Sequence, residues 1–450
     1  MHHDQGALGA ASERDAVYRQ VKKLKEMGCN AIRTSHNTPS SVLLEACNEL
    51  GMMVMDETFD GWAFPKNGNS QDFSTHFNQT ISADNKLLGA TTGDTWYKFI
   101  LESNIERDKN DPSVIIWDIG NELNFGVTDS SQYEQYAKNM KSYIEAIDKT
   151  RPITVGDNNP NGLQNANTQE FRNKVSTVLA KNGEGLANYS MGSMAGIHKT
   201  HPDWKIIATE SASPSNSRGI YNTLSQYNKT GDYQCTAYDT NAVSWGNTAR
   251  ESWWYTIKDD FVSGEFIWTG FDYLGEPTPY SVYPVGVSSF GTIDTAGFAK
   301  DSFYLYQSQW TSTPMVHLLP GNWDQWHDGE EVEVWVNTNQ PSAELFLNGE
   351  SLGKKSFDEK ETAYGKKYYE TSEKTQDDKT WGDSTNPGGY TSNGAVLDDG
   401  ELNSGKLHLT WKVPYQAGTL EVKAYDKNGK VVATDSVSTS STPYTRSEER

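Results

Sequence analysis

Short apolar runs alternate with amphipathic segments along residues 12–311. Residues 12–28 carry apolar side chains at helical spacing, and Gly28 is a typical helix stop. Ser113–Leu123 is a bounded apolar run, typical of a buried strand of a parallel sheet. The same pattern predicts strands that begin near residues 30, 53, 114, 153, 186, 206 and 265. It predicts helices over residues 12–28, 40–50, 94–109, 131–148, 168–181, 192–200, 247–262 and 301–311.

Strands that alternate with helices indicate βαβ units and parallel pairing. Seven strand–helix pairs follow an initial helix, whose own strand would lie before residue 10. We therefore predict an α/β fold, a (β/α)8 TIM barrel in residues 1–312 that lacks most of its first strand. A doubly wound open sheet is the alternative, but no glycine-rich fingerprint follows any of the strands.

The pattern changes after Pro314, where short alternating segments replace the helices. Asn348-Gly349 joins two of these segments and is a strong hairpin signal. Residues 313–440 are therefore predicted to form an all-β sandwich. The polar stretch 356–404 is predicted to be a surface loop of this domain, and residues 441–450 a polar tail or linker.

Composition narrows the classes of function. The net charge of −21 over 450 residues argues against nucleic acid or an anionic membrane as a partner. No apolar run of 18 residues exists, so we expect no membrane span. Aromatic residues make up 12% of the chain, which is common in proteins that stack on sugar rings. The three cysteines can form neither a disulfide framework nor a recognisable metal site.

The opening residues MHHDQGALGA lack the charged and apolar regions of a signal peptide. Few cysteines and an acidic surface rich in Asn, Ser and Thr favour a secreted or cell-surface bacterial protein. A cytoplasmic location is the alternative.

Two glutamates each follow an apolar strand. Glu122 comes after Asn121 on the fourth strand, and Glu210 comes after Thr209 on the seventh, when the missing first strand is counted. Strands at these positions face each other across a barrel mouth, where such folds place their chemistry. Two carboxylates across a sugar make an acid/base and a nucleophile, and a separation of about 5–5.5 Å gives retention of configuration. The alternative is that one glutamate only pairs with an arginine.

Further polar and aromatic residues end other strands. Arg33 could stabilise the charge of Glu210, and His36 and Asn37 could bind hydroxyl groups, although His36 could equally cap the next helix. Trp268 could stack on a sugar or pack in the core. Two other strand-end residues, Asp157 and Tyr189, suit a polar cup. Four more acidic strand-end residues are interpreted mainly as scaffold groups paired with Arg and Lys: Asp56, Glu57, Asp60 and Glu265.

Taken together, several segments resemble glycoside hydrolase family 2, and most nearly its branch of streptococcal surface β-galactosidases. The resemblance covers nearly the whole chain. The segments that carry it are HHDQGALGA, GCNAIRTSHN, MDETFDGW, IIWDIGNE, IIATESAS, FIWTGFDYLGEPTPY, GFAKDSFYLYQSQW, MVHLLPGNW and AELFLNGESLG.

The resemblance implies a retaining exo-β-galactosidase that acts on β-galactoside oligosaccharides. Glu122 matches the family's acid/base, Asn121 its ligand of the sugar 2-hydroxyl, and Glu210 its nucleophile. The galactose site would further be lined by His2, Arg33, His36, Asn37, Asp157, Tyr189 and Trp268. Members also carry a jelly-roll and an immunoglobulin-like domain before the barrel, and the predicted sandwich would be a following immunoglobulin-like domain.

Two departures from the family pattern matter. The chain begins where the pattern already reads HHD, so the missing strand would leave unpaired edges. The metal-using branch has Glu-x-His where this chain has Phe59-Asp60-Gly61-Trp62, so we predict no cofactor and no catalytic magnesium.

Other activities stay open as alternatives. β-Glucuronidase and β-mannosidase belong to the same family, and a glucuronidase typically has an Asn-x-Lys motif near the end of the barrel. After the last predicted strand of the barrel, which begins near residue 265, this motif occurs only at Asn428-Gly429-Lys430. These residues lie in a predicted hairpin turn of the sandwich. An inactive carbohydrate-binding fragment is the alternative from another class.

Overall fold

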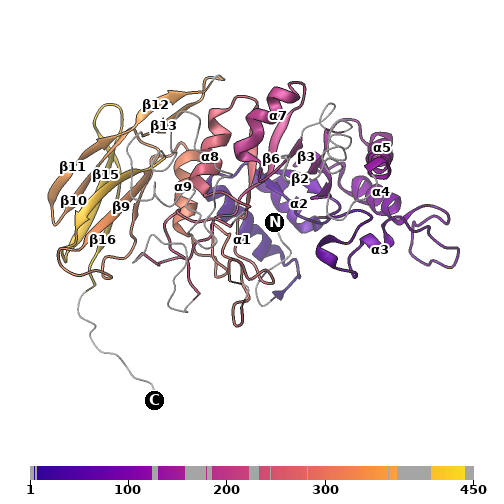
Figure 1. The fold of residues 1–450 in the computed structure, drawn as a ribbon, viewed down its shortest axis with the longest axis horizontal. Coiled ribbons are helices and arrows are strands. Elements are labelled where there is room, and N and C mark those ends of the chain that lie inside the picture. The colour runs from indigo at the N-terminus through magenta and orange to yellow at the C-terminus, as the bar shows by residue number, and fades with distance from the viewer. Residues whose placement is uncertain are drawn as a thin grey trace, which may run out of the picture. The chain divides into compact units, whose positions relative to one another are not determined.

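The structure is a computed structural model (Figure 1). It describes residues 5, 8–123, 130–157, 179, 185–221, 233–243, 245–280, 282–362, 364–371 and 407–440. The chain divides into two compact units. Unit 1 comprises Met1–Ser211 and Tyr255–Thr269, and unit 2 comprises Ala212–Trp254 and Gly270–Arg450.

Strands and helices alternate in the part of the chain that forms unit 1 (Figure 1). The strands are β1 (Ala31–Arg33), β2 (Met53–Glu57), β3 (Val114–Asn121), β4 (Ile153–Gly156), β5 (Gly185–Asn188), β6 (Ile206–Ala212) and β7 (Val262–Trp268). The helices are α1 (Arg14–Met27), α2 (Ser41–Leu50), η2 (Lys66–Gly68), α3 (Ser74–Phe77), α4 (Trp96–Asp108), α5 (Ser130–Ile147), η3 (Met191–Ser193) and α7 (Met194–Thr200). A further helix, α8 (Ala249–Lys258), is divided between the units, with Ala249–Trp254 in unit 2 and the rest in unit 1.

The parallel strands of unit 1 lie in chain order. One sheet has the order β1-β2-β3-β4 and the other β5-β6-β7. The N–H of Asn188, at the end of β5, donates to the carbonyl of Asp157 beside β4 (2.7 Å), and β1 and β7 also contact each other. This order is that of a TIM barrel rather than of a doubly wound sheet, in which the order reverses at a switch point.

Local sequence explains several element ends. Gly28 ends α1 in the left-handed conformation (φ 102°), and Ser40 caps α2 by accepting a hydrogen bond from the N–H of Leu43 (3.3 Å). The first helix begins at Arg14, slightly later than its apolar spacing predicts. The helix predicted over 168–181 lies outside the described residues except for Leu179.

The long connection after β2 is anchored by aromatic side chains. Trp62 stacks on Tyr133 of α5 (centroids 5.4 Å apart), and Phe77 of α3 stacks on Tyr97 of α4 (4.7 Å). The indole N–H of Trp62 donates to the carbonyl of Ile119 on β3 (2.7 Å). Although its sequence is largely polar, this connection is therefore packed against its own unit at several points.

Unit 2 contains antiparallel sheets and one further helix, α9 (Asp301–Trp310). Its strands are β8 (Val316–Leu319), β9 (Glu331–Thr338), β10 (Ser342–Leu347), β11 (Glu350–Ser356), β12 (Asp358–Glu361), β13 (Lys367–Glu370), β14 (Leu409–Pro414), β15 (Thr419–Tyr425) and β16 (Val431–Ser438). The sheet orders are β11-β10-β15-β16 and β14-β9-β8, with β12 and β13 as a separate hairpin.

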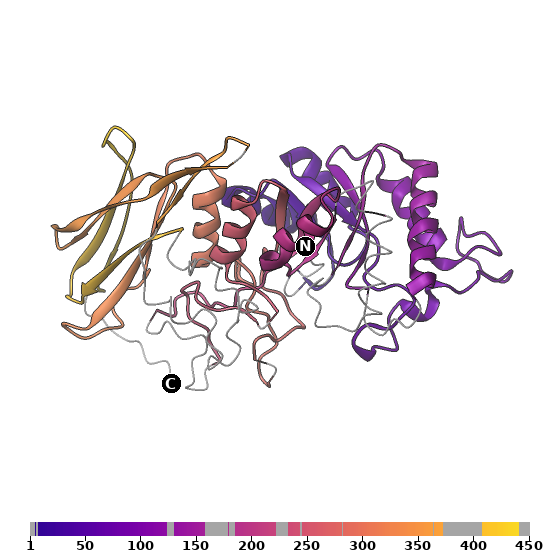
Figure 2. The same ribbon diagram turned by 45° about the horizontal axis from the view of Figure 1, so that its top comes forward.

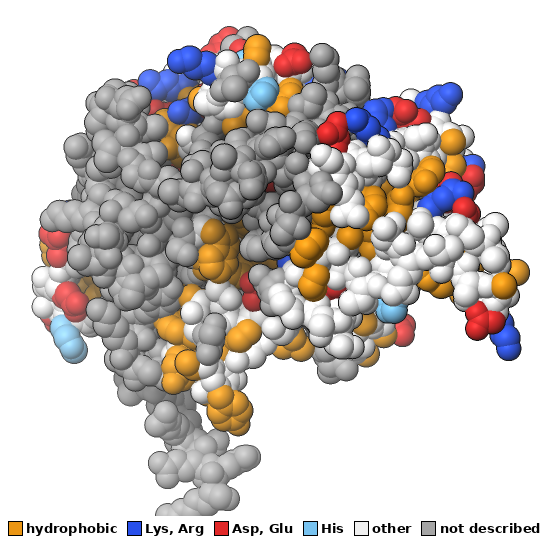
Figure 3. Space-filling model, turned by 45° about the vertical axis from the view of Figure 1, so that its right-hand side comes forward, with side chains coloured by type: hydrophobic (Ala, Val, Ile, Leu, Met, Phe, Trp, Pro, Cys, Tyr) orange, Lys and Arg blue, Asp and Glu red, His pale blue; other side chains and the backbone are white. Residues whose placement is uncertain are grey.

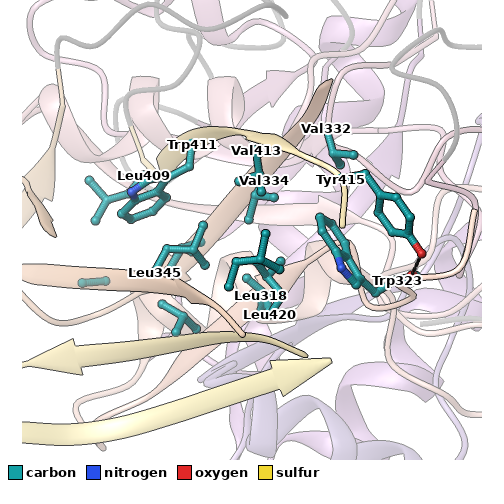
Figure 4. Close-up of a cluster of buried hydrophobic side chains, with 14 of the residues drawn as sticks. Leu318, Trp323, Val332, Val334, Leu345, Leu409, Trp411, Val413, Tyr415 and Leu420 are labelled. Atoms are coloured by element: carbon teal, nitrogen blue, oxygen red, sulfur yellow. Dashed lines mark hydrogen bonds between the residues drawn. The ribbon is translucent and has the colours of Figure 1, made fainter. Parts of the chain in front are cut away.

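Two facing layers of strands enclose the core of this sandwich (Figure 2). Val334 of β9 and Leu345 of β10 lie in the core together with Leu420 of β15 (Figure 4). The hydroxyl of Tyr415 donates to the carbonyl of Trp323 at one end of the cluster (3.0 Å). The alternation in the sequence therefore correctly predicts an all-β sandwich.

Two details of unit 2 differ from the sequence-based expectation. The stretch predicted to be a loop over 356–404 contains the β12–β13 hairpin among its described residues. The polar positions of β9 after Glu331 are also buried: Glu333 is only 6% exposed and accepts a hydrogen bond from the indole of Trp335 (2.7 Å). The hydroxyl of Tyr238 donates to the carbonyl of Glu333, so an irregular segment of the same unit covers this face.

On the face drawn in Figure 3, the described Lys and Arg side chains are scattered among acidic ones and do not gather into one basic patch. Among the described residues, no helix is both long and apolar enough to cross a membrane.

A histidine joins three elements within unit 2. Nε2 of His317 on β8 lies 2.8 Å from Oδ1 of Asp301 on α9, and Nδ1 lies 3.6 Å from Oδ2 of Asp435 on β16. Burial alone would lower the pKa of His317, but the two carboxylates outweigh it and raise the pKa to about 9. His317 is therefore charged at neutral pH and stabilises the packing of α9 on the strands.

We predict that His317→Gln lowers the free energy of unfolding in a pH-dependent way. The pKa of His317 is raised on folding, so its contribution is fully present below pH 6.5 and is lost as the pH rises through about 9. The difference from wild type should be no more than about 3 kcal/mol at pH 6 and should vanish near pH 10. Urea unfolding followed by tryptophan fluorescence measures it. The exposed His327 provides the control His327→Gln, and an equal loss at both pH values would contradict the prediction.

Candidate functional site

The functional candidates of unit 1 lie at the carboxyl ends of its parallel strands. Arg33 ends β1, Asn121 ends β3, Glu210 lies near the end of β6 and Trp268 ends β7. Glu122 is the residue that follows β3. This is the end of the strands at which TIM barrels build their sites.

The buried guanidinium of Arg33 lies between three carboxylates. Nε is 3.0 Å from both Oδ2 of Asp118 and Oε2 of Glu57, and Nη1 donates to Oε2 of Glu210 (2.9 Å). The side chains of Glu57 and Asp118 are fully buried, and that of Glu210 is 7% exposed. Arg33 therefore compensates three negative groups that water hardly reaches.

Burial and mutual repulsion change how these groups titrate. Burial would lower the pKa of Arg33, but Glu57, Asp118 and Glu210 outweigh it and raise the pKa, so Arg33 stays charged. Burial raises the pKa of Glu57 to about 7 and that of Asp118 to about 8, although the charge of Arg33 opposes both shifts. The cluster therefore tends to hold protons near neutral pH, because one cation cannot compensate three buried anions.

Side-chain amides extend the cluster toward Glu122. Oδ1 of Asn121 accepts hydrogen bonds from Nη2 of Arg33 (3.1 Å) and Nδ2 of Asn188 (2.7 Å). Oδ1 of Asn188 accepts from the hydroxyl of Thr209 (2.7 Å), and Nδ2 lies 3.5 Å from Oε1 of Glu122. Both candidate glutamates are thus connected through Arg33 and two buried asparagines.

The backbone at Glu122 is held in an uncommon conformation. Glu122 has φ 48°, in the left-handed region, and its N–H donates to the carbonyl of Gly156 (2.7 Å). A Cβ on the neighbouring Gly120 would lie 2.6 Å from the indole nitrogen of Trp62, so only glycine fits there. The carboxylate of Glu122 is 18% exposed, with Oε2 3.7 Å from Nζ of Lys66. Strain of this kind commonly occurs at functional sites.

Glu210 is more enclosed than Glu122. Burial raises the pKa of Glu210 above its ordinary value and the charge of Glu122 adds to this rise, whereas Arg33 and a hydrogen bond from the Tyr189 side chain lower it. The N–H of Tyr189, another residue with positive φ (48°), donates to the carbonyl of Glu210 (2.8 Å). The predicted effect of Arg33 on Glu210 is therefore present, but burial exceeds it.

His36 and Trp268 form one wall of the site. Their rings stack with centroids 5.1 Å apart. Nδ1 of His36 lies 2.9 Å from Oε1 of Glu57, and Nε2 lies 3.7 Å from Oε2 of Glu210. Burial and the charge of Arg33 hold the pKa of His36 well below its usual range, so the ring is neutral. The alternative role of His36 as the cap of the next helix is wrong, because Ser40 caps α2.

The sequence profile "Glycosyl hydrolases family 2, TIM barrel domain" matches residues 1–292. The chain belongs to glycosyl hydrolase family 2. A second profile, DUF4982, a domain of unknown function, matches residues 329–373 and 377–433.

Known members of family 2 resemble the chain over almost all of its length. Beta-galactosidase BoGH2A of Bacteroides ovatus is 34% identical over 98% of this chain and 48% of its own. A putative beta-glucuronidase of Formosa agariphila is 29% identical over 98% of this chain and 37% of its own. The crystal structure of a beta-glycosidase from Bacteroides vulgatus has a TM-score of 0.72 at 30% identity, covering 98% of this chain and 49% of that one. The chain thus spans between about a third and a half of the length of these relatives.

The remaining predicted site residues of this family 2 chain are placed as follows. Asn37 is exposed in the turn after β1, and Asp157 is half-buried directly after β4. His2 lies outside the described residues.

Some residues that build the site were missed or undervalued in the sequence. Asp118 and Asn188 were missed. An acidic residue inside the apolar run of β3 was a signal for Asp118, because such a residue is buried only with a partner, and Asp118 is fully buried. Glu57 was interpreted as scaffold and does pair with Arg33, but within the site. Lys66 begins the single-turn helix η2 within the connection after β2, where no periodicity in the sequence indicates its position.

The chemistry of the described residues also bears on a metal site. No group of three or more His, Cys, Asp or Glu among them could hold a metal ion. Beside the acidic pair Asp60 and Glu122 lies instead the ammonium group of Lys66, 2.5 Å from Oδ1 of Asp60. The described part of the site therefore does not fit a divalent cation there.

We predict that Gly156→Ala destabilises the protein. A Cβ at this position would lie 2.7 Å from Nη2 of Arg33 and 3.0 Å from the side-chain oxygens of both Asn121 and Asn188. Since these groups are buried and bonded to one another, the free energy of unfolding should fall by about 1–3 kcal/mol. Urea unfolding measures the change. Gly196→Ala on α7, where nothing lies within 4 Å of the added Cβ, is the control. A Gly156→Ala variant as stable as the control variant would show that the site tolerates a shift of these groups.

Proposed function

We propose that this chain is the catalytic part of a retaining exo-β-galactosidase. Glu210 is the nucleophile and Glu122 the acid/base. The observation that carries the proposal is the junction of the two glutamates, at the ends of β3 and β6, through Arg33, Asn121 and Asn188.

The reaction has two displacements. The Glu210 carboxylate attacks the anomeric carbon while Glu122 gives its proton to the departing glycosidic oxygen, so the C–O bond breaks and a glycosyl-enzyme ester forms. Glu122, now a carboxylate, then takes a proton from water, which attacks the same carbon and releases the sugar and Glu210. Arg33 and Tyr189 favour the carboxylate form of Glu210 that the first step requires.

The rest of the proposed site would hold galactose. Asn121 would bind the 2-hydroxyl, and Trp268, which is already stacked on His36, would offer its ring to a sugar face. The other side chains proposed to line the galactose are His2, Arg33, His36, Asn37, Asp157 and Tyr189. The similarity to BoGH2A, a beta-galactosidase, supports this choice of sugar.

Charge favours a neutral sugar over a glucuronide, although relatives include putative beta-glucuronidases. Both cations in the described part of the site already form ion pairs. Arg33 pairs with three carboxylates, and Lys66 pairs with Asp60. A uronate carboxylate would meet these acids, while both cations of the described part of the site already pair with other carboxylates. The Asn-x-Lys sequence at 428–430 lies between β15 and β16, in unit 2.

Several finer features remain part of the proposal. Residues 313–440 would be an immunoglobulin-like domain and residues 1–312 the barrel. The full protein would belong to the streptococcal surface branch, carry jelly-roll and immunoglobulin-like domains before the barrel, and act outside the cell on β-galactoside oligosaccharides without a cofactor.

The proposal predicts β-galactoside hydrolysis that depends on Glu210. The chain should hydrolyse para-nitrophenyl β-galactoside faster than the β-glucuronide or the β-mannoside, and Glu210→Gln should lower kcat by at least about 10³-fold because the nucleophile is lost. A 2-deoxy-2-fluoro-galactoside with a dinitrophenolate leaving group should label Glu210, as mass spectrometry of peptides would show.

Glu265→Gln is a matched control, because Glu265 on β7 bonds to the hydroxyls of Ser211 and Thr256. A folded chain with no turnover of any of the three glycosides would favour the inactive carbohydrate-binding fragment, and faster glucuronide or mannoside turnover would change the assigned sugar.

A second prediction concerns the acid limb of the pH profile. Glu210 attacks only as a carboxylate, so the acid limb of kcat/KM follows its pKa in the free enzyme. The Tyr189 side chain lowers that pKa. Tyr189→Phe should therefore raise it and move the acid limb to higher pH by ~1 unit. Tyr143→Phe on α5 is the control, and an unchanged limb in Tyr189→Phe would show that the hydroxyl does not act on Glu210.

A further inference from the structure

We propose that Lys66 is a positioning residue for Glu122, and that Asp60 holds its ammonium group against the acid/base carboxylate. This inference rests on the proposed role of Glu122 as acid/base. Lys66 comes from the connection after β2, so it would extend the catalytic machinery beyond the ends of the strands.

The contacts of Lys66 place its charge at one point of the site. Nζ lies 2.5 Å from Oδ1 of Asp60, 3.5 Å from the carbonyl of Asn121 and 3.7 Å from Oε2 of Glu122. The Lys66 side chain is only 16% exposed and that of Glu122 18% exposed. At these distances in a partly enclosed site, the ammonium group attracts the Glu122 carboxylate and orients it.

Asp60 ties Lys66 to the residue next to Glu122. The N–H of Asn121 donates to the carbonyl of Asp60 (2.8 Å), and Nδ2 of Asn121 donates to Oδ1 of the same residue (3.2 Å). Oδ1 of Asp60 therefore contacts both Lys66 and Asn121. A movement of β3 at Asn121 would also move Asp60, which holds Lys66. The ammonium group would therefore stay close to Glu122.

The connection that carries Lys66 is itself held in place. The N–H of Lys66 donates to Oδ2 of Asp72 (2.9 Å), and the other oxygen of Asp72 accepts from the N–H of Ser74 at the start of α3 (2.9 Å). Phe73 beside them stacks on Phe59 (centroids 5.7 Å apart). Backbone and side-chain contacts both fix this segment. Little additional conformational entropy is therefore lost when Lys66 is held at the site.

A positioned ammonium group serves both displacement steps. When Glu122 gives its proton to the leaving oxygen, a carboxylate appears beside Lys66, and the fixed charge stabilises that product of proton transfer without reorganisation. In the second step the same contact aims the carboxylate at water. The effect should be largest for leaving groups that need proton donation, since good leaving groups depart without it.

A purely structural role predicts a different outcome. Asp60 is 38% exposed at its side chain, and ion pairs with one partner open to solvent contribute little to stability. Loss of Lys66 should thus leave the fold intact, and its consequence should be confined to the chemistry of Glu122.

The test compares two galactosides that differ only in leaving group, phenyl and 2,4-dinitrophenyl, with Lys66→Met and Lys66→Arg. For Lys66→Met we expect kcat/KM for the phenyl galactoside to fall ~10–100-fold and that for the dinitrophenyl galactoside to change less than ~3-fold. Lys66→Arg should recover part of the loss, because it keeps a cation. Lys98→Met, which breaks the Lys98–Asp94 pair (3.0 Å) at the end of the same connection, should change neither value.

Any other outcome contradicts either the proposed role of Lys66 or the proposed role of Glu122. Equal losses with both substrates, or no loss with either, would overturn the proposal for Lys66. Glu122→Gln measured on the same pair separates this from the proposed function: if Glu122→Gln also lacks leaving-group dependence, Glu122 is not the acid/base. If Glu122→Gln shows the dependence and Lys66→Met does not, only the role of Lys66 fails.

Discussion

The site depends on one buried cation. Arg33 bonds to Glu210 and lies within 3.0 Å of Asp118 and Glu57, all of them largely removed from water. A buried charge is tolerated only when partners compensate it, and removal of one partner leaves the others uncompensated. The guanidinium therefore determines where the ends of β1, β2, β3 and β6 lie relative to one another. It also explains the glycine at position 156, whose missing side chain leaves room for Nη2 of Arg33.

The two candidate glutamates differ in their surroundings although they occupy similar sequence positions. Glu210 lies beside Arg33 and accepts a hydrogen bond from Tyr189, which favours the negative charge, while its burial opposes that charge. Glu122 lies further toward solvent and beside Lys66. Environments that differ in this way are what allow two carboxylates of one site to take different parts in a reaction.

Glu122 and Tyr189 both have positive φ values, and they occupy equivalent positions in the site. Each is the first residue beyond a strand, and each donates its N–H to a carbonyl on another strand end. These bonds stabilise a conformation that costs energy for residues with side chains. The chain thereby turns sharply at the strand ends and directs functional side chains into the site.

The sequence by itself determined the alternation of strands and helices, the sandwich after Pro314, and the position of Glu122 and Glu210 at strand ends. Each of these follows from local periodicity, and a parallel strand places its carboxyl end where barrels build sites. Only the tertiary structure decided that Asp118 and Asn188 belong to the site, that Lys66 reaches Glu122, and that Tyr238 covers β9 at Glu333. These contacts join residues far apart in the chain, and burial by distant segments shifts the pKa of Glu210. The local sequence pattern does not predict which distant side chains will be in contact, because the packing of the whole unit determines those contacts.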